Sequence, residues 1–473
     1  MTKLSQPLVV DLDGTLIKTD LLLESFMILI KQNPFNLIFV LIWLLQGKAV
    51  LKAEIAKRVE IPVDLLPYNG EVLEYLQNQK QQGRLLYLAT ASNKRYADAI
   101  AHHLGLFEAV FSSDENINLS GVNKREFLNK QFAETGYVYA GNSEIDLNVW
   151  EQSSAAVVVG TGQLTAKAKK LCPLEKHIHV PNPHFKFYIK ALRVHQWVKN
   201  GLIFVPLLTS HSMNDPDMVI ACLLAFAAFS LCASSVYFLN DLLDLNDDRC
   251  HPTKKDRPFA AGSLSLLVGI IGTPMLLGLS GFFCLFLPIE FFLTLLAYYG
   301  LTIAYSFKLK RLVMVDVVTL ASLYTIRIVA GVAAIGVAFS FWLLSFSVFV
   351  FLSLAIVKRY TELMKLRDMS TQKALGRGYQ VKDVELLSSL GGASGYISVL
   401  VLALYINSPD IRSLYSQPEI MWPTCLVMLY WVSRVWIIAH RGHMNDDPIL
   451  FALKDTASLV CGAIIGAFML MAV

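Results

Sequence analysis

Long apolar segments occupy the chain beyond residue 187, and they limit its fold more than any other feature. The hydrocarbon core of a bilayer offers no water to backbone groups, so a segment that crosses it forms a helix of about 20 residues. Apolar residues make up 55% and charged residues 16% of the 473 residues, which is too apolar for a soluble protein of this length. We predict nine membrane-spanning segments, near 187–210, 217–239, 265–287, 289–306, 312–335, 340–357, 389–407, 419–439 and 456–473.

The residues before these segments have the pattern of an α/β domain. Apolar runs at Leu8–Val10, 85–89 and 137–140 predict buried strands, with helical patterns between them. The predicted parts are an α/β domain over 1–180 with a helical cap at about 16–83, a linker at 181–190, and an all-α membrane bundle of nine helices over 187–473.

The distribution of charge predicts the topology. Lysine and arginine gather in the loops after alternate apolar segments, so we expect those loops and the N-terminal domain on the cytoplasmic side of the cell (inner) membrane. The first residues have no signal-peptide pattern. A net charge of +4 without a basic face argues against nucleic-acid binding, and seven scattered cysteines argue against disulfides and a zinc site.

An acidic sequence directly follows the 217–239 segment, and we call residues 240–258 the aspartate-rich segment. If the helix continues, spacings of three and four place its acidic side chains on one face. Carboxylates suit Mg²⁺, which proteins commonly bind together with substrate phosphates, and nearby cations would hold further phosphate charge. The alternative is a solvated helix end. The residues concerned are Asn240, Asp241, Asp244, Asp247, Asp248, His251, Lys254 and Arg257.

The pattern Asn240-Asp241-x-x-Asp244-x-x-x-Asp248 resembles the first aspartate-rich motif of the UbiA-type intramembrane prenyltransferases. The resemblance implies about nine helices around a lipid-accessible cavity, with Mg²⁺ bridging a diphosphate to the protein. It implies metal ligation by Asn240, Asp244 and Asp248, and catalytic roles for Asp241, Asp244 and Asp248. Where such families carry a second acidic motif, this chain has Lys358 and Arg359, with Glu362 one helical turn later.

The continuation His251-Pro252-x-Lys254-x-x-Arg257-Pro258, and Gln196–Asn200 at the first apolar segment, are similar to the decaprenyl-phosphate phosphoribosyltransferase branch. This resemblance implies transfer of phosphoribose from phosphoribosyl pyrophosphate to a polyprenyl phosphate, in cell envelope biosynthesis. The lipid is then the acceptor. The expected phosphate-binding residues are Lys199, Asn240, Lys254, Arg257, Arg327, Lys358 and Arg359.

Two ionisable residues, Asp316 and Arg327, lie within the apolar 312–335 segment. Such groups are costly in a membrane, so we expect them to line a cavity, or else to form a buried structural pair. Asp446 and Asp447, before the last apolar segment, would supply an acidic group to the membrane site or simply precede a helix that starts at Pro448.

The sequence Asp11-Leu12-Asp13-Gly14-Thr15 after the first strand resembles motif one of the haloacid dehalogenase (HAD) superfamily. The resemblance implies that Asp11 is a nucleophile that forms an aspartyl-phosphate and that Asp13 is the general acid and base. Thr90 and Lys124 match its phosphate-binding residues. The metal set would be Asp11, Asp13, Asn142 and Asp146, and Asp146 or Glu144 would compensate for the charge that Asn142 lacks.

Asn142 departs from the HAD pattern, which has an aspartate there, and so removes a charge from the metal site. The domain is therefore either an active or an inactive phosphatase. Within the cap, the apolar run 35–45 is too short to span a bilayer. It is either a buried cap helix or a segment that dips into the membrane.

The combined motifs predict a bifunctional membrane enzyme, in which the bundle makes polyprenyl-phosphoryl-phosphoribose and the soluble domain removes its 5-phosphate. One alternative is a conventional prenyltransferase that moves a polyprenyl group from its diphosphate to an aromatic or other small acceptor. Another is a transporter or lipid-binding protein with a phosphate-sensing domain.

Overall fold

The computed structural model describes residues 6–113, 118–368, 378–444 and 447–473. The chain forms two compact units. The first unit comprises Met1–Leu192 with Tyr237–Thr273, and the second comprises Arg193–Val236 with Pro274–Val473. The aspartate-rich segment thus belongs to the same unit as the N-terminal domain. The predicted boundaries near residues 180 and 187 stay predictions.

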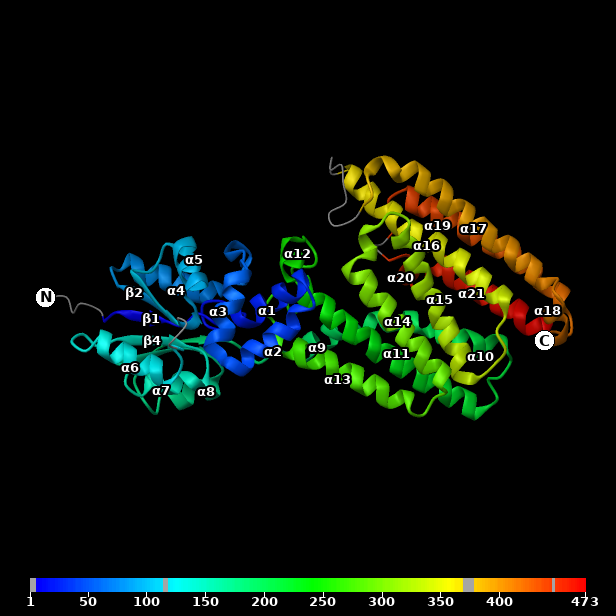
Figure 1. Ribbon diagram of the computed structural model, residues 1–473. Coiled ribbons are helices and arrows are strands. Elements are labelled where there is room, and N and C mark those ends of the chain that lie inside the picture. Colours follow the sequence, from blue (N-terminus) through cyan, green and yellow to red (C-terminus); the bar gives the residue numbers. More distant parts are fainter. Residues whose placement is uncertain (1–5, 114–117, 369–377, 445–446) are drawn as a thin grey trace. The chain divides into compact units, whose positions relative to one another are not determined.

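A six-stranded parallel sheet forms the centre of the first unit (Figure 1), in the order β3-β2-β1-β4-β5-β6. The strands predicted from the apolar runs are confirmed. This order is that of a doubly wound fold, in which ligands bind outside the carboxyl ends of the strands where the order reverses. The strands are β1 (Leu8–Val10), β2 (Leu86–Asn93), β3 (Ala109–Ser113), β4 (Val138–Gly141), β5 (Ala155–Gly160) and β6 (Leu174–His179).

Helices cover both faces of the sheet because alternate strand residues point to opposite sides. Leu8 and Val10 belong to a core with α1, α3, α4 and α5, whereas Val9 belongs to a core with α6, α7 and α8. The helices of the first core are α1 (Leu21–Gln32), α3 (Lys48–Arg58), α4 (Gly70–Gln81) and α5 (Lys94–Leu104). Those of the second are α6 (Val122–Gln131), α7 (Leu147–Trp150) and α8 (Gly162–Ala168).

The predicted cap region between β1 and β2 contains four helices, with α2 (Asn36–Gln46) between α1 and α3. The side chain of Asp20 caps α1 by accepting from the backbone N–H of Leu23. The first unit also contains α9 (Phe185–Leu192), α12 (Leu245–Cys250), and short 3₁₀ helices at Val63–Leu65 (η1) and Glu144–Asp146 (η2).

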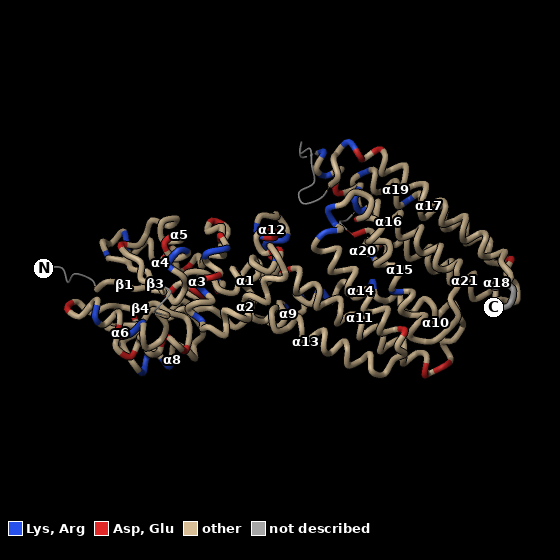
Figure 2. The backbone as a smooth tube through the Cα atoms, in the orientation of Figure 1, with Lys and Arg blue, Asp and Glu red and all other residues tan. Residues whose placement is uncertain are grey.

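Seven helices in the described part of the chain are long and apolar enough to cross a membrane. They match seven of the nine predicted segments. In Figure 2 α13 carries no charged residue, as its sequence requires. The helices are α11 (Pro216–Leu243), α13 (Leu266–Cys284), α14 (Ile289–Phe307), α15 (Val315–Ile335), α16 (Phe341–Asp368), α17 (Val384–Ile406) and α19 (Pro423–His440).

The other two predicted segments differ from the prediction of one long spanning helix each. The 187–210 segment is not one helix, because the chain turns at Arg193, which has a left-handed φ of 51°. It continues as a 3₁₀ helix, η3 (Val194–Phe204), and then α10 (Val205–Thr209), and η3 uses the buried polar side chains of Lys199 and Asn200 for contacts. The last segment is α21 (Thr456–Ala472), with 17 residues. The remaining short elements are α18 (Pro409–Leu414), α20 (Pro448–Ala452), η4 (Leu309–Arg311), η5 (Val381–Asp383) and η6 (Pro418–Met421).

Close packing of α15 against η3 organises the core of the second unit. At Gly331 of α15 there is no room for a side chain, because an added Cβ would meet the carbonyl oxygen of Ile203 and the ring of Pro206. Nothing lies within 4 Å of the Cβ position at Gly300 of α14.

We expect Gly331→Ala to destabilise the protein by about 1–3 kcal/mol, since a backbone must move to admit the methyl group. Gly300→Ala is the matched control and should cause no loss, because alanine favours helix and meets open space there. Thermal unfolding of the detergent-solubilised protein measures both. Equal unfolding temperatures for the two variants would contradict this packing.

Candidate functional site

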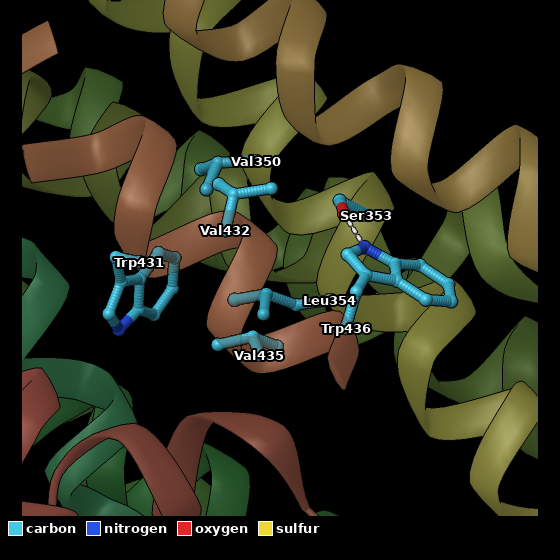
Figure 3. A pocket seen from close by; sticks show the side chains of 7 residues that line it. All are labelled: Val350, Ser353, Leu354, Trp431, Val432, Val435 and Trp436. Carbon is cyan, nitrogen blue, oxygen red and sulfur yellow. Dashed lines mark hydrogen bonds between the residues drawn. The ribbon is translucent and has the colours of Figure 1, made fainter. Parts of the chain in front are cut away.

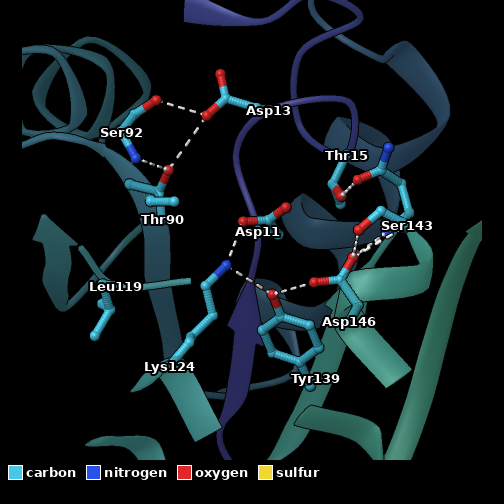
Figure 4. Close-up of polar contacts among 12 residues, drawn as sticks. Asp11, Asp13, Thr15, Thr90, Ser92, Leu119, Lys124, Tyr139, Ser143 and Asp146 are labelled. Carbon is cyan, nitrogen blue, oxygen red and sulfur yellow. Dashed lines mark hydrogen bonds and ion pairs between the residues drawn. The ribbon is translucent and has the colours of Figure 1, made fainter. Parts of the chain in front are cut away.

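The carboxyl ends of β1, β2 and β4 bring the predicted soluble-site residues together (Figure 4). Asp11 and Asp13 directly follow β1, and Thr90 lies in β2. The chain turns at Gly14, directly after Asp13, and the φ of 76° at this position favours glycine. This edge, where the strand order reverses between β1 and β4, is where a doubly wound fold binds ligands.

Lys124 of α6 is directed at Asp11. Its Nζ donates to Asp11 Oδ1 at 2.7 Å and to the hydroxyl of Tyr139 at 2.9 Å. Burial raises the pKa of the Asp11 carboxyl to about 6, and the charge of Lys124 opposes that rise. The arrangement places a cation beside the carboxylate, where a phosphate bound to Asp11 would need neutralising.

Asp13 is held by β2 and by the start of α1. The hydroxyl of Ser92 donates to Asp13 Oδ2 at 2.6 Å, and the backbone N–H of Leu21 donates to Oδ1 at 2.8 Å. Burial, and then the charge of Asp20, raise the pKa of Asp13 to about 7. A pKa near neutrality suits a group that both gives and takes a proton. Ser92 was not predicted, although its position two residues beyond Thr90 in one strand gives it the same direction.

The fourth predicted motif forms a tight hydrogen-bonded turn around Asp146. The Oδ2 atom of Asp146 accepts from the backbone N–H of Asn142 at 3.0 Å and from that of Ser143 at 2.9 Å. Its Oδ1 accepts from the hydroxyl of Tyr139 at 3.0 Å. Glu144 is exposed and pairs with Lys167 instead. Asp146 therefore shapes the turn through these hydrogen bonds.

Asn142 accepts from the hydroxyl of Thr15 at 3.0 Å through its Oδ1. An amide oxygen is a neutral ligand of the kind that Mg²⁺ accepts beside a carboxylate, so the set fits a weakly charged site. Across the described ranges, however, no three His, Cys, Asp or Glu side chains are grouped as a metal site. The predicted ligation by Asp11, Asp13, Asn142 and Asp146 stays a prediction.

The cap contributes a cation that the motifs did not reveal. Lys52 of α3 donates to the carbonyl oxygen of Ala91 at 2.6 Å and to Asn118 Oδ1 at 3.0 Å. Burial lowers the pKa of Lys52, and the charge of Asp13 opposes this change. Because Lys52 lies far from every motif in the sequence, only the fold reveals it as a candidate ligand for an anionic substrate.

In the aspartate-rich segment the helix does not continue without a break, because α11 ends at Leu243 and α12 begins at Leu245. The carboxylates form two pairs rather than one row. Asp241 and Asp248 both meet Arg257 Nη1, at 3.1 and 2.7 Å. The second pair faces the cap.

That second pair, Asp244 and Asp247, meets Nζ of Lys31 at 3.1 and 2.7 Å. Burial opposes the charge of Lys31, but its bonds to the two aspartates raise its pKa overall. The four carboxylates of this segment have the oxygen chemistry of a Mg²⁺ site. A metal ion on them would compete with Arg257 and Lys31 for the same oxygen atoms.

A buried ion pair fixes α1 to α12. Arg249 Nη1 and Nη2 lie 2.5 and 3.1 Å from the two carboxylate oxygens of Glu24. Glu24 is fully buried and also accepts from the hydroxyl of Thr19 at 2.9 Å. Arg249 further donates to the carbonyl oxygen of Ala260 at 3.0 Å. The pairing of Glu24 with Arg249 was not predicted from the sequence.

In the second unit Lys199 forms an ion pair with Asp447. Asp447 also caps α20, since its Oδ1 accepts from the backbone N–H of Ile449 at 3.1 Å. Asp447 therefore precedes and caps the helix that starts at Pro448, while its role in the membrane site stays a prediction. Burial opposes ionisation of Asp447, but the charges of Lys199 and Lys358 lower its pKa. Asp446 lies outside the described residues.

Asp316 and Arg327 do not pair with each other. Asp316 lies 2.5 Å from Nε of Arg359 on α16, which also forms an ion pair with Glu362. Arg327 donates to Asn200 Oδ1 at 2.9 Å. Asp316 thus belongs to a structural ion pair, and the predicted phosphate contacts of Arg327, Lys358 and Arg359 stay predictions, as do those of Asn240 and Lys254.

An apolar pocket between α16 and α19 is lined by valine, leucine and tryptophan side chains (Figure 3). Its polar lining group, the hydroxyl of Ser353, accepts from Nε1 of Trp436 at 3.1 Å. The pocket offers no group for a charged substrate, and we interpret it as helix packing.

We expect Glu24→Gln to cost about 3–5 kcal/mol, because it leaves the Arg249 charge buried without its counter-ion. Glu60→Gln is the control, since Glu60 forms an exposed pair with Arg95 that should contribute about 0–1 kcal/mol. Thermal unfolding of the purified protein compares the two variants. A similar loss for both would mean that the Glu24–Arg249 pair is not buried.

Residues 202–454 match the UbiA prenyltransferase family. An uncharacterized protein of Sinorhizobium fredii is 37% identical, over 98% of this chain and 91% of its own length. A decaprenyl-phosphate phosphoribosyltransferase of Mycolicibacterium smegmatis is 35% identical, over 56% of this chain and 86% of its own length. The structure of a UbiA homologue from Archaeoglobus fulgidus bound to DMAPP and Mg²⁺ covers 60% of this chain and 98% of its own, with 16% identity and a TM-score of 0.47.

The family match covers more than half of the chain. It includes the aspartate-rich segment and all seven described helices that are able to cross a membrane. The chain therefore belongs to the UbiA prenyltransferase family and is a membrane-embedded transferase with several spans.

Proposed function

We propose that this transferase moves phosphoribose from phosphoribosyl pyrophosphate to a polyprenyl phosphate at the cytoplasmic face of the inner membrane. The observation that carries the proposal is the aspartate-rich segment, in which four carboxylates and Arg257 gather where α11 ends. The 35% identity to a decaprenyl-phosphate phosphoribosyltransferase supports the choice of donor and acceptor. So does Lys358-Arg359, which stands where a second acidic motif would be expected.

In this reaction an oxygen of the polyprenyl phosphate attacks C1 of the ribose, the C1–O bond to pyrophosphate breaks, and pyrophosphate leaves. When bound by Asn240, Asp244 and Asp248, Mg²⁺ supplies positive charge that stabilises the leaving group. Arg257 orients Asp241 and Asp248. The reaction needs no protein nucleophile, so the enzyme contributes positioning and charge neutralisation.

Lys199 and Lys358 form a second cationic group with Asp447. Lysine ammonium groups bind phosphate as point charges. We assign to these lysines the binding of an anionic group of one substrate, and Asp447 balances their charge when that group is absent.

The same proposal makes the soluble domain a HAD-type phosphatase that acts on the product of the membrane reaction. Asp11 would attack the 5-phosphate and form an aspartyl-phosphate, while Asp13 protonates the departing sugar oxygen. Asp13 then removes a proton from the water that releases inorganic phosphate. Support comes from Lys124 beside Asp11 and from Ser92 and Leu21 holding Asp13.

The second candidate is a conventional prenyltransferase, and the name of the matched family supports it. It would use the same aspartate-rich segment, but with the diphosphate on the polyprenyl chain. The substrates, rather than the metal, distinguish the two functions.

We expect purified protein with Mg²⁺ to convert phosphoribosyl pyrophosphate and polyprenyl phosphate, and not polyprenyl diphosphate and an aromatic acid. Mass spectrometry of the lipid product identifies donor and acceptor together. Asp244→Asn should lower turnover by about 10²–10³-fold, because it removes charge that stabilises the leaving group. Asp256→Asn, at an exposed position of the same segment, should retain activity. A prenylated aromatic product would establish the second candidate instead.

We expect the lipid product to release inorganic phosphate with the parent protein but not with Asp11→Asn, whereas Asp98→Asn on the exposed side of α5 should behave as the parent. Asn142→Asp should lower the Mg²⁺ concentration needed for half-maximal phosphate release, because it adds a charged ligand. Phosphate release that is equal in the parent and in Asp11→Asn would contradict the phosphatase assignment while leaving the membrane reaction intact.

A further inference from the structure

The helix α2 in the cap exposes nearly all of its side chains, and nearly all of them are apolar. We call the exposed residues the α2 apolar face. Only Val40 and Trp43 of this helix are buried. The helix has no charged residue, and its two polar residues are at its ends. The face consists of Phe35, Leu37, Ile38, Phe39, Leu41, Ile42, Leu44 and Leu45, with Leu45 90% exposed.

A continuous exposed apolar surface marks an interaction site or a membrane contact rather than an ordinary water-facing surface. The helix is firmly held on its other side. Trp43 packs into the domain core, with the guanidinium of Arg58 4.6 Å from its ring centroid. The α2 apolar face is therefore a fixed surface rather than an unfolded segment.

The position of α1 relates this face to the membrane. The last turn of α1 carries Lys31, which binds Asp244 and Asp247, and the first turn of α1 carries Glu24, which binds Arg249. Asp244, the first of these partners, directly follows Leu243, which is the last residue of the spanning helix α11. Since the end of a spanning helix lies at the bilayer surface, the C-terminal end of α1 lies there too.

The start of α2 is close to that point. Asn36 follows Lys31 by five residues, which reach at most about 17 Å when fully extended. The first unit also presents Leu267 and Ile271 of α13 as exposed apolar residues, which belong to a spanning helix and so face lipid. The α2 apolar face thus begins near the level where hydrocarbon is available to cover it.

We propose that α2 lies in the interface of the bilayer and inserts its apolar face among the lipids. Eleven residues make a helix about 16 Å long, too short to cross the hydrocarbon core, so the helix lies in one leaflet. Such a helix is held by its apolar contact area. The alternative is that a second copy of the chain covers the α2 apolar face. The experiment below distinguishes this alternative from lipid contact. The proposal does not depend on either proposed catalytic activity.

The insertion has a structural consequence for the soluble site. Gly47 directly joins α2 to α3, which carries Lys52 beside Ala91 and Asn118. The proposed lipid contact and the Lys52 cation are thus carried by two consecutive helices, α2 and α3. A lipid-linked phosphate would reach this site from the surface on which the cap rests.

The test uses the full chain in nanodiscs of phosphatidylethanolamine and phosphatidylglycerol, with the exposed Cys250 replaced by serine. A nitroxide is attached in turn to Ile38→Cys, Leu41→Cys and Leu45→Cys, and to Glu71→Cys on the exposed face of α4 as the control. Power-saturation EPR measures the accessibility of each label to oxygen, which concentrates in lipid, and to a water-soluble nickel chelate.

We expect the three α2 labels to show a severalfold higher oxygen accessibility and a severalfold lower nickel accessibility than the label at Glu71. Nickel accessibility equal to that of the control would overturn the proposal, because the face would then be in water. Low accessibility to both reagents would also overturn it, because protein would then cover the face. In the double variant Leu41→Glu with Leu45→Glu, the Ile38 label should move towards the control values while the protein remains folded by thermal unfolding.

Discussion

Within each unit of the described structure, several buried charges meet an opposite charge, and these ion pairs join elements that lie far apart in the sequence. In the first unit Lys124 meets Asp11, and Glu24 meets Arg249. In the second unit Asp316 meets Arg359. An unpaired buried charge would cost several kcal/mol, comparable to the whole stability of a domain. The ion pairs therefore decide which elements can be neighbours.

Much of the fold follows from local sequence patterns. Apolar runs gave the strands β1, β2 and β4, because parallel strands buried on both faces are continuously apolar. Length and apolarity gave the seven spanning helices. The prediction of one spanning helix at 187–210 was wrong, because the average apolarity of the segment hides three polar residues. The chain turns at Arg193, and the side chains of Lys199 and Asn200 are buried in polar contacts. Hydropathy measures the average of a segment, whereas helix continuity depends on single residues.

The sequence motifs predicted some of the side chains that lie together, but not how these side chains pair. The motifs placed Asp11, Thr90 and Lys124 at one edge of the sheet, as the structure has them. They did not reveal Ser92 or Lys52, nor that Lys31 and Arg257 divide the aspartates into two pairs. Glu24 and Arg249 are 225 positions apart, and a single sequence contains no signal that joins residues at such separations.

The contact of Lys31 with Asp244 and Asp247 joins the cap to the carboxylates at which we propose that Mg²⁺ binds. The ammonium group and a metal ion cannot occupy the same carboxylate oxygens together. If Mg²⁺ binds these carboxylates as proposed, thermodynamic reciprocity requires that a tighter hold of α1 on the segment weakens the metal affinity, and that metal binding loosens α1 by the same free energy. Since α1 begins at the backbone N–H that holds Asp13, the soluble site would sense the loading of the membrane site through one helix.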